Sequence, residues 1–251
     1  MKILPVSFQS EGLNLAGELY TPEGTPPFPA LCLCHGIPAA AYNPQDQGYP
    51  LLARRFCAAS FVTFIFNFRG AGRSEGNLDM PGWSRDLSAA LDIVSALEEI
   101  DKRQITVMGF SAGAAVAVYV AGHDRRIASL VTGACPADFN FLLESQPASQ
   151  LIQHFRDIGV IKDEAFPPSL TEWLNGFAEI TPLRWIGRIS PRSILIVHGD
   201  EDEVVPLEHA RRLYRKAGEP KDLAIIPGAG HRLRLEEKAI NAALAWLKAK
   251  S

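Results

Sequence analysis

The sequence predicts an α/β fold in which helices cover both faces of a mostly parallel sheet. Short apolar runs alternate with longer segments of helical period along most of the 251 residues. The middle runs are apolar on both faces, which is typical of a parallel sheet covered on both sides. Two further runs flank Ser10-Glu11-Gly12 near the N-terminus and predict an antiparallel hairpin at the edge of that sheet.

The expected elements follow in chain order. The hairpin strands are expected at residues 3–8 and 14–20. The later strands are expected at residues 30–34, 62–66, 105–109, 127–132, 194–198 and 223–226. Helices are expected at residues 51–59, 83–100, 112–122, 207–217 and 236–248. Alternating strands and helices of this kind form right-handed crossovers in a layered fold.

The alternation is interrupted once, between residues 135 and 192. No clear strand occurs there, and short helical pieces are separated by Pro147, Gly159, Pro167-Pro168 and Pro182. The segment is too long for a plain loop and too short for a second domain of its own. We therefore predict one domain over residues 1–251, with a helical lid insertion at about 136–191 over one edge of the sheet.

Composition excludes several classes of protein. The net charge is −3, from 25 basic and 28 acidic residues, which gives no reason to expect a nucleic acid or an anionic membrane as partner. The N-terminal residues lack the apolar core of a signal peptide, and the longest apolar runs are too short to span a bilayer. We expect a soluble, cytoplasmic protein, and a homodimer remains open.

The cysteines predict neither disulfides nor a metal centre. Four cysteines in a chain of this length do not form a disulfide framework. Cys32 and Cys34 alternate within one apolar run, so they should share one face of a strand. His35 follows them, but no second cluster of cysteines and histidines completes a zinc site. We expect no metal and no cofactor.

The segment Gly109-Phe110-Ser111-Ala112-Gly113 carries the first chemical signal. The motif G-x-S-x-G is weak by itself, but here it joins an apolar strand to an alanine-rich helix, as a nucleophile elbow requires. Glycines two residues before and after Ser111 permit a very tight turn. Ser111 would then stand above the carboxyl edge of the sheet, at a helix N-terminus that favours developing negative charge.

His35-Gly36-Ile37 follows an earlier strand and lies where an oxyanion loop is expected. An acyl-transfer site needs two backbone N–H groups that bind the developing oxyanion. The N–H groups of Ile37 and Ala112 are the predicted donors. The structural alternative is a turn in which His35 caps the local backbone.

An acid and a base follow the last two predicted strands. Asp200 and Asp202 lie in the loop 198–206, and His231 ends a glycine loop after the final strand. The chain order Ser, Asp, His is the order that nucleophile-elbow enzymes use. His231 would accept the proton of Ser111, and the acid would orient the imidazole. Asp200 is the competing acid, and would otherwise be a turn residue that bonds its own backbone.

Together these segments resemble the α/β-hydrolase superfamily from about Leu15 to the C-terminus. Within it the chain is similar to small bacterial esterases and to the catalytic domain of prolyl-oligopeptidase-like enzymes. The resemblance implies G-x-x-D-x-x-V-P for the acid loop, which assigns Asp202. The loop Arg69–Ser74 also resembles the superfamily, but Asn67 stands where an acid is common, and we interpret that loop as structural. The sequence His-Gly-Ile-Pro argues against the hormone-sensitive-lipase branch.

The predicted function is a serine hydrolase that cleaves small acyl or aromatic carboxylic esters through an acyl-enzyme. Peptidase or thioesterase activity with the same residues is the alternative, and a non-catalytic binding protein is a third. The insertion is rich in large apolar side chains, of which most should pack onto the sheet and a few should line an apolar pocket above Ser111. These side chains are Phe139, Phe141, Leu142, Leu143, Phe155, Phe166, Trp173, Phe177 and Trp185.

Overall fold

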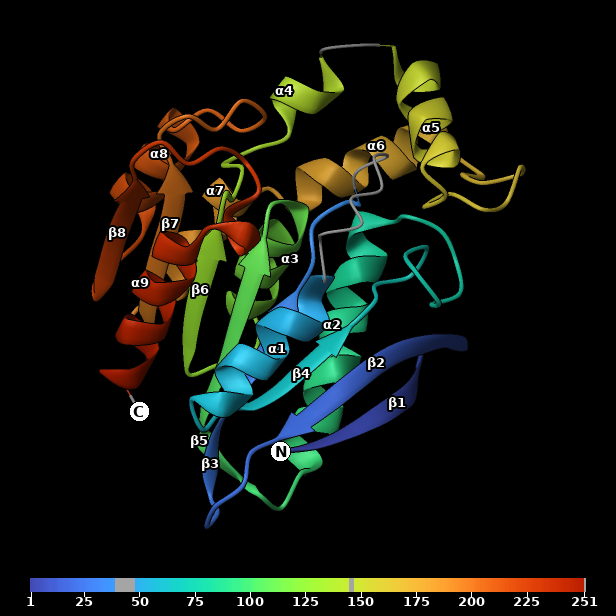
Figure 1. The fold of residues 1–251 in the computed structure, drawn as a ribbon. Helices are drawn as coiled ribbons and strands as arrows, with labels where there is room; N and C mark the ends of the chain where they lie inside the picture. Colours follow the sequence, from blue (N-terminus) through green and yellow to red (C-terminus); the bar gives the residue numbers. More distant parts are fainter. Residues whose placement is uncertain (39–47, 145–146, 251) are drawn as a thin grey trace.

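The computed structural model describes residues 1–38, 48–144 and 147–250. In this part of the chain eight strands form one sheet, in the order β1-β2-β4-β3-β5-β6-β7-β8 (Figure 1). The strands are β1 (Lys2–Ser10), β2 (Leu13–Thr21), β3 (Phe28–Cys34), β4 (Val62–Phe66), β5 (Ile100–Phe110), β6 (Ser129–Gly133), β7 (Ser193–Gly199) and β8 (Lys221–Ile226). The predicted α/β fold class is confirmed.

The strands change direction only near the N-terminus. β1 pairs antiparallel with β2, and β2 pairs antiparallel with β4. From β4 to β8 every neighbouring pair is parallel. The hairpin turns at Glu11 and Gly12, whose φ angles are +50° and +81°. Two consecutive positive φ angles are typical of the tight turns that match strand twist, so the predicted hairpin is also confirmed.

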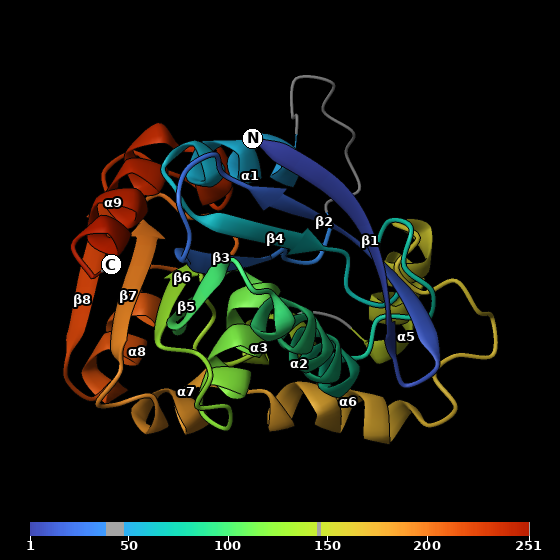
Figure 2. The ribbon, with the colours of Figure 1, turned by 90° about the horizontal axis from the view of Figure 1, so that it is seen from below.

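Helices cover both faces of the sheet (Figure 2). α1 (Gly48–Ala58) and α9 (Glu237–Lys248) pack on one face with Leu31, Leu33 and Val131 of the strands. α2 (Met80–Ala96), α3 (Ala112–Ala121) and α8 (Glu208–Lys216) pack on the other. Because successive side chains of a strand point to opposite faces of the sheet, adjacent residues of one strand lie in different cores. Cys32 and Cys34 both lie in the second core, as their spacing predicts.

The helix before β5 differs from the expected 83–100. It begins at Met80, because the Asp79 side chain accepts a hydrogen bond from the Gly82 N–H and caps the first turn. It ends at Ala96, and Ile100 already belongs to β5. Among the described residues, no helix is both long and apolar enough to cross a membrane.

The segment between β6 and β7 is helical, as expected, and its helices lie in two places. It contains α4 (Asn140–Leu143), α5 (Ala148–Asp157), α6 (Leu170–Glu179), α7 (Pro182–Trp185) and the 3₁₀ turn η1 (Ile186–Arg188). α4 and α5 lie beyond the carboxyl ends of the strands (Figure 1), whereas α6 and α7 form an outer layer on α2 and α3 (Figure 2). The apolar face of α6 buries Trp173 and Phe177 there. The lid role and the single domain stay predictions.

The loop after β4 is held by a buried ion pair. The Arg69 guanidinium donates to Asp86 of α2 at 2.7 Å and to Glu11 of the hairpin at 2.9 Å. The indole N–H of Trp83 donates to the Arg69 carbonyl at 3.0 Å. Arg69 is therefore paired with an acid from α2, although Asn67 two residues before it carries no charge. This geometry agrees with a structural role for the loop.

Candidate active site

Ser111 stands at a sharp turn between β5 and α3. Its φ and ψ angles are +51° and −125°, a conformation that residues other than glycine adopt rarely and at a cost in energy. Three hydrogen bonds hold it there. The Ser111 N–H donates to the Gly133 carbonyl at 2.9 Å, and the Ser111 carbonyl accepts from Ala114 and Ala115. The strained residue is therefore fixed by both neighbouring elements.

The glycines of this turn are dictated by close backbone contacts. A Cβ on Gly109 would lie 2.6 Å from the Ala114 Cα, and one on Gly113 would lie 2.1 Å from the His35 carbonyl oxygen. A Cβ on Gly36 would lie 3.0 Å from the Ser111 Cβ. The loop after β3 thus presses directly against the turn that carries Ser111.

Ser111, His231 and Asp202 lie in one hydrogen-bonded line. Ser111 Oγ is 3.0 Å from His231 Nε2, and His231 Nδ1 is 2.9 Å from Asp202 Oδ2. A carboxylate can only accept, so Nδ1 carries the proton and Nε2 is free to accept from Ser111. Glu203 accepts a hydrogen bond from the His231 backbone N–H at 3.1 Å and helps to fix that loop.

The two candidate acids have different partners. Asp200 accepts the Gly228 N–H at 2.7 Å, which joins the loops after β7 and β8. Asp202 has a fully buried side chain and accepts from the N–H groups of Val204 and Val205 as well as from His231. Burial raises the pKa of Asp202, but these hydrogen bonds outweigh it and hold the pKa below its ordinary value. Asp202 is therefore ionised beside the imidazole.

The loop after β3 carries His35 and Ile37. The ring of His35 accepts the Phe68 N–H at Nε2, 3.0 Å away, and its Nδ1–H donates to the Gly36 carbonyl at 2.6 Å. Burial lowers the pKa of His35 to about 4. Within residues 1–38, 48–144 and 147–250, the N–H groups of Ile37 and Ala112 have no hydrogen-bond partner. Two donors thus remain available beside Ser111.

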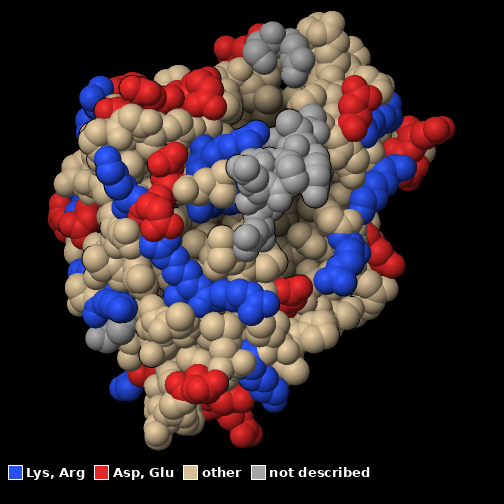
Figure 3. All heavy atoms as spheres, viewed as in Figure 1, with Lys and Arg blue, Asp and Glu red and all other residues tan. Residues whose placement is uncertain are grey.

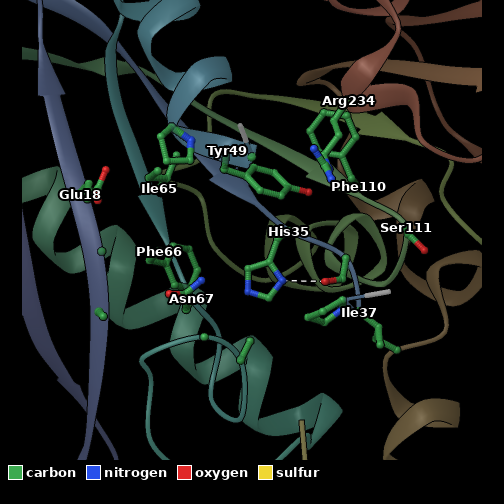
Figure 4. A pocket seen from close by; sticks show the side chains of 18 of the residues that line it. Glu18, His35, Ile37, Tyr49, Ile65, Phe66, Asn67, Phe110, Ser111 and Arg234 are labelled. Carbon is green, nitrogen blue, oxygen red and sulfur yellow. Dashed lines mark hydrogen bonds between the residues drawn. The ribbon is translucent and has the colours of Figure 1, made fainter. Parts of the chain in front are cut away.

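A cavity of about 590 Å³ opens in front of Ser111 and His231. This volume lies within the range of small-molecule sites. Figure 4 shows Ser111 and Glu18 at opposite ends of it, with Tyr49 and Phe110 along one side. The Arg234 guanidinium lies 5.5 Å from the centre of the Tyr49 ring. Most of the space is bounded by apolar and aromatic groups.

Among the residues that the structure describes, Glu18, Arg73, Arg232 and Arg234 are the acidic and basic side chains that line the cavity. Figure 3 shows Lys and Arg side chains on both sides of the hollowed centre of this face, with acidic side chains among them. Both signs of charge therefore occur on the face that carries the site. The sequence did not indicate these lining residues, because they come from β2, the loop after β4 and the turn η2 (Leu233–Leu235), which are far apart in the chain.

The insertion contributes none of the described residues that line this cavity. The expectation that some of its aromatic side chains line the pocket above Ser111 is therefore wrong for this cavity. Phe139, Phe155, Trp173 and Phe177 instead contact one another edge to face with ring centres 5.1–5.9 Å apart. All four are almost fully buried, and burial of such large apolar side chains stabilises the packing of the insertion.

The model of the "Alpha/beta hydrolase family" matches residues 33–243. The chain belongs to this family. The match covers the loop after β3, the Ser111 turn, the acid loop and His231. The matched range therefore includes Ser111, Asp202 and His231.

Individual relatives are distant. The chain is 28% identical to the uncharacterised protein YfhR of Escherichia coli K12 over 174 residues, which is 68% of this chain and 54% of YfhR. The match thus spans about half the length of that protein. The crystal structure of the α/β hydrolase GrgF from Penicillium is similar with a TM-score of 0.78, 23% identity and 99% of both chains covered. Est1E from Butyrivibrio proteoclasticus, solved with ferulic acid, gives 0.74, 18% identity and coverage of 98% and 97%. These two likenesses show the α/β-hydrolase fold.

Proposed function

We propose that this α/β-hydrolase is a serine esterase that cleaves small acyl or aromatic carboxylic esters through an acyl-enzyme. The line from Ser111 Oγ through His231 to Asp202, with distances of 3.0 and 2.9 Å, is the observation that carries the proposal. Serine is a weak nucleophile until a base accepts its proton, and this arrangement supplies that base in the required tautomer.

In the first half of the reaction, Ser111 Oγ attacks the ester carbonyl carbon while His231 Nε2 takes the hydroxyl proton. The carbonyl oxygen becomes an oxyanion, which the N–H groups of Ile37 and Ala112 are positioned to bind. The intermediate collapses, the C–O bond to the alcohol breaks, and His231 returns the proton to the departing alkoxide. Asp202 stabilises the imidazolium that exists between these steps.

In the second half, water replaces the alcohol. His231 takes a proton from the water, and the hydroxide attacks the acyl-Ser111 carbonyl. The same donors bind the second oxyanion. Collapse releases the carboxylic acid, and the proton on His231 returns to Ser111 Oγ. The two halves together consume one ester and one water and return Ser111 and His231 to their starting protonation states.

The cavity supports the choice of substrate. Ile37, Tyr49 and Phe110 offer apolar and aromatic surface close to Ser111, and a volume of about 590 Å³ admits a small acyl or aromatic group. Est1E, which has the same fold, was solved with the aromatic acid ferulic acid. Both facts favour small esters over long polymers.

A panel of purified substrates tests the proposal. We expect p-nitrophenyl esters of short and aromatic acids to be hydrolysed with an initial burst of nitrophenol, because acylation releases the alcohol before water regenerates the enzyme. Matched thioesters and aminoacyl amides serve as the comparison and should react more slowly. A preference for either of these would replace the esterase assignment. Absence of both turnover and labelling by a fluorophosphonate would indicate a binding protein.

A further inference from the structure

His198 lies directly behind the candidate acid. It is the penultimate residue of β7, and its exposed fraction is 0%. Its Nε2 is 2.8 Å from the Val205 carbonyl oxygen and 3.4 Å from Asp202 Oδ2. Four side chains therefore follow one another from the cavity into the core: Ser111, His231, Asp202 and His198.

The partners of His198 define its tautomer. The Val205 carbonyl can only accept, so Nε2 must carry a hydrogen. Burial, the largest influence, lowers the pKa of His198, and the nearby charge of Asp202 opposes that shift. His231 and, on α8, His209 are the other titratable groups that act on it. The ring is thus neutral, with its Nε2–H dipole directed towards Val205 and Asp202.

Val205 links the two side chains. Its N–H donates to Asp202 Oδ1 at 2.8 Å, and its carbonyl accepts from His198. Val205 is therefore hydrogen-bonded both to the carboxylate of Asp202 and to the ring of His198. Since Oδ1 is held by backbone N–H groups, the orientation of the carboxylate depends on where this loop lies.

A histidine at position 198 costs more folding free energy than a side chain that only fills space. In the described part of the chain its Nδ1 is buried without a hydrogen-bond partner, as is Thr132 Oγ1 on the neighbouring strand β6. A buried polar atom left unpaired costs roughly 1–3 kcal/mol. An apolar side chain of similar size would avoid that cost, so the Nε2–H contacts are the feature that distinguishes histidine here.

We propose that His198 is a positioning residue, which orients the Asp202 carboxylate towards His231 through the Val205 carbonyl and through its own Nε2–H dipole. This inference rests on the proposed function. It assigns to His198 no contact with substrate, because Asp202 and His231 stand between it and Ser111.

Two substitutions separate positioning from packing. His198→Phe removes the Nε2–H and keeps a buried ring, whereas His198→Gln keeps a donor near the same place. We expect His198→Phe to lower kcat on p-nitrophenyl butyrate roughly ten- to a hundredfold, as loss of an outer hydrogen-bond partner does at metal sites. KM should stay unchanged, and the apparent pKa of the base in the kcat/KM profile should shift. His198→Gln should restore most of kcat.

Thr132→Val is the matched control. It removes the other buried, unpaired polar atom on an adjacent strand without touching the acid loop, so kcat and the pH profile should stay as in the wild type. A folded His198→Phe protein with wild-type kcat and pH profile would contradict positioning. If Ser111→Ala also kept its turnover, the proposed function itself would fall. If His198→Phe kept the wild-type kcat and pH profile while Ser111→Ala lost its turnover, only the positioning role of His198 would be contradicted.

A measurement on the wild-type enzyme covers the case in which His198→Phe does not fold. Phosphonylation of Ser111 Oγ by a fluorophosphonate breaks the P–F bond, releases fluoride and removes the hydroxyl hydrogen that faces His231 Nε2, which changes the contact between His231 and Asp202. The nitrogen NMR signal of His198 Nε2 should therefore move on phosphonylation, with the ring still in the Nε2–H tautomer. An unchanged signal, or an Nδ1–H tautomer, would overturn the proposal.

Discussion

Ser111 and its partners illustrate how single residues are positioned by the backbone around them. Ser111 is held at a positive φ by hydrogen bonds from β6 and α3, and His231 is held by Glu203 through its backbone N–H. Asp202 is held by two backbone N–H groups of its own loop. Each side chain of the line thus has its orientation determined before substrate arrives, which is what efficient acyl transfer requires.

The contrast between Asp200 and Asp202 gives a prediction at this scale. Asp202→Asn should lose about four orders of magnitude in kcat, as the equivalent change does in the best-studied serine protease, because the imidazole then adopts the wrong tautomer. Asp200→Asn should keep most of its activity, since Asp200 contacts the Gly228 N–H and not His231. Steady-state kinetics of the two purified variants measure this.

Thermal unfolding supplies the control for this pair. Asp200→Asn should be less stable by about 1 kcal/mol, the usual net contribution of one hydrogen bond. If Asp200→Asn were the inactive variant and Asp202→Asn the active one, the acid would be Asp200.

His35 predicts a pH dependence of stability. Its pKa in the folded protein is about 4, below the ordinary 6.5, so between these values the unfolded chain binds a proton that the folded chain does not. The free energy of unfolding should therefore fall as the pH falls from 6.5 towards 4, by about 3 kcal/mol from this residue alone. Urea unfolding at several pH values, compared with His35→Gln, isolates the contribution.

His123→Gln, which removes an exposed histidine, is the control for His35. It should leave the slope of stability against pH as in the wild type. A His35→Gln protein with an unchanged slope would show that His35 takes up its proton equally in both states.

The sequence could indicate candidate chemical residues but not the residues that support them. Ser111, Asp202 and His231 stand in short motifs whose glycines reflect local backbone demands, so the sequence itself carries the signal. His198 gave none, because a histidine at a strand end has many roles and its contacts with Val205 and Asp202 arise only in the folded loop.

At the scale of elements, the strand β4 and the helix before β5 show the clearest contrast between prediction and structure. The strand of residues 62–66 was predicted at its observed bounds, since a buried parallel strand is a continuous apolar run. The helix before β5 was misplaced at both ends, although Asp79 and Pro81 are typical start signals and point to Met80. The apolar period of α2 continued into β5 without a glycine or proline between them, so the period alone could not mark its end.

The contact between the Ser111 turn and the loop after β3 predicts the effect of a single methyl group. Gly113→Ala would put a Cβ 2.1 Å from the His35 carbonyl oxygen. That oxygen belongs to the backbone, so it cannot move aside as the end of a flexible side chain can. Alanine is the better helix former by about 1 kcal/mol, but the clash should outweigh that gain and cost more than about 2 kcal/mol. Activity should fall with it, because Ile37 would move away from Ser111.

Gly187→Ala is the matched control for Gly113→Ala. The nearest contact of a Cβ there is the Lys216 carbonyl oxygen at 3.4 Å, so stability and turnover should be close to those of the wild type. Urea unfolding and p-nitrophenyl ester hydrolysis of both variants test the prediction. A Gly113→Ala protein as stable and active as Gly187→Ala would mean that the two loops are not packed as described.

At the scale of the whole molecule, the cavity shows what a sequence alone does not reveal. Its walls come from β2, the loop after β3, the loop after β4 and the turn η2, which meet only because the sheet order places β4 and β3 between β2 and β5. The aromatic residues of the insertion were conspicuous in the sequence, yet Phe139, Phe155, Trp173 and Phe177 are buried against one another and do not line the cavity. Apolar composition indicates burial, but not which neighbours a side chain meets.

The central claim is that Ser111 forms the acyl-enzyme, and the turnover of Ser111→Ala tests it most directly. The variant should keep the thermal stability of the wild type, because only one hydroxyl group is removed beside an open cavity. Its kcat on p-nitrophenyl butyrate should fall by about four to six orders of magnitude, as loss of a catalytic serine does elsewhere. A folded Ser111→Ala protein that hydrolyses the ester within tenfold of the wild-type rate would contradict the account.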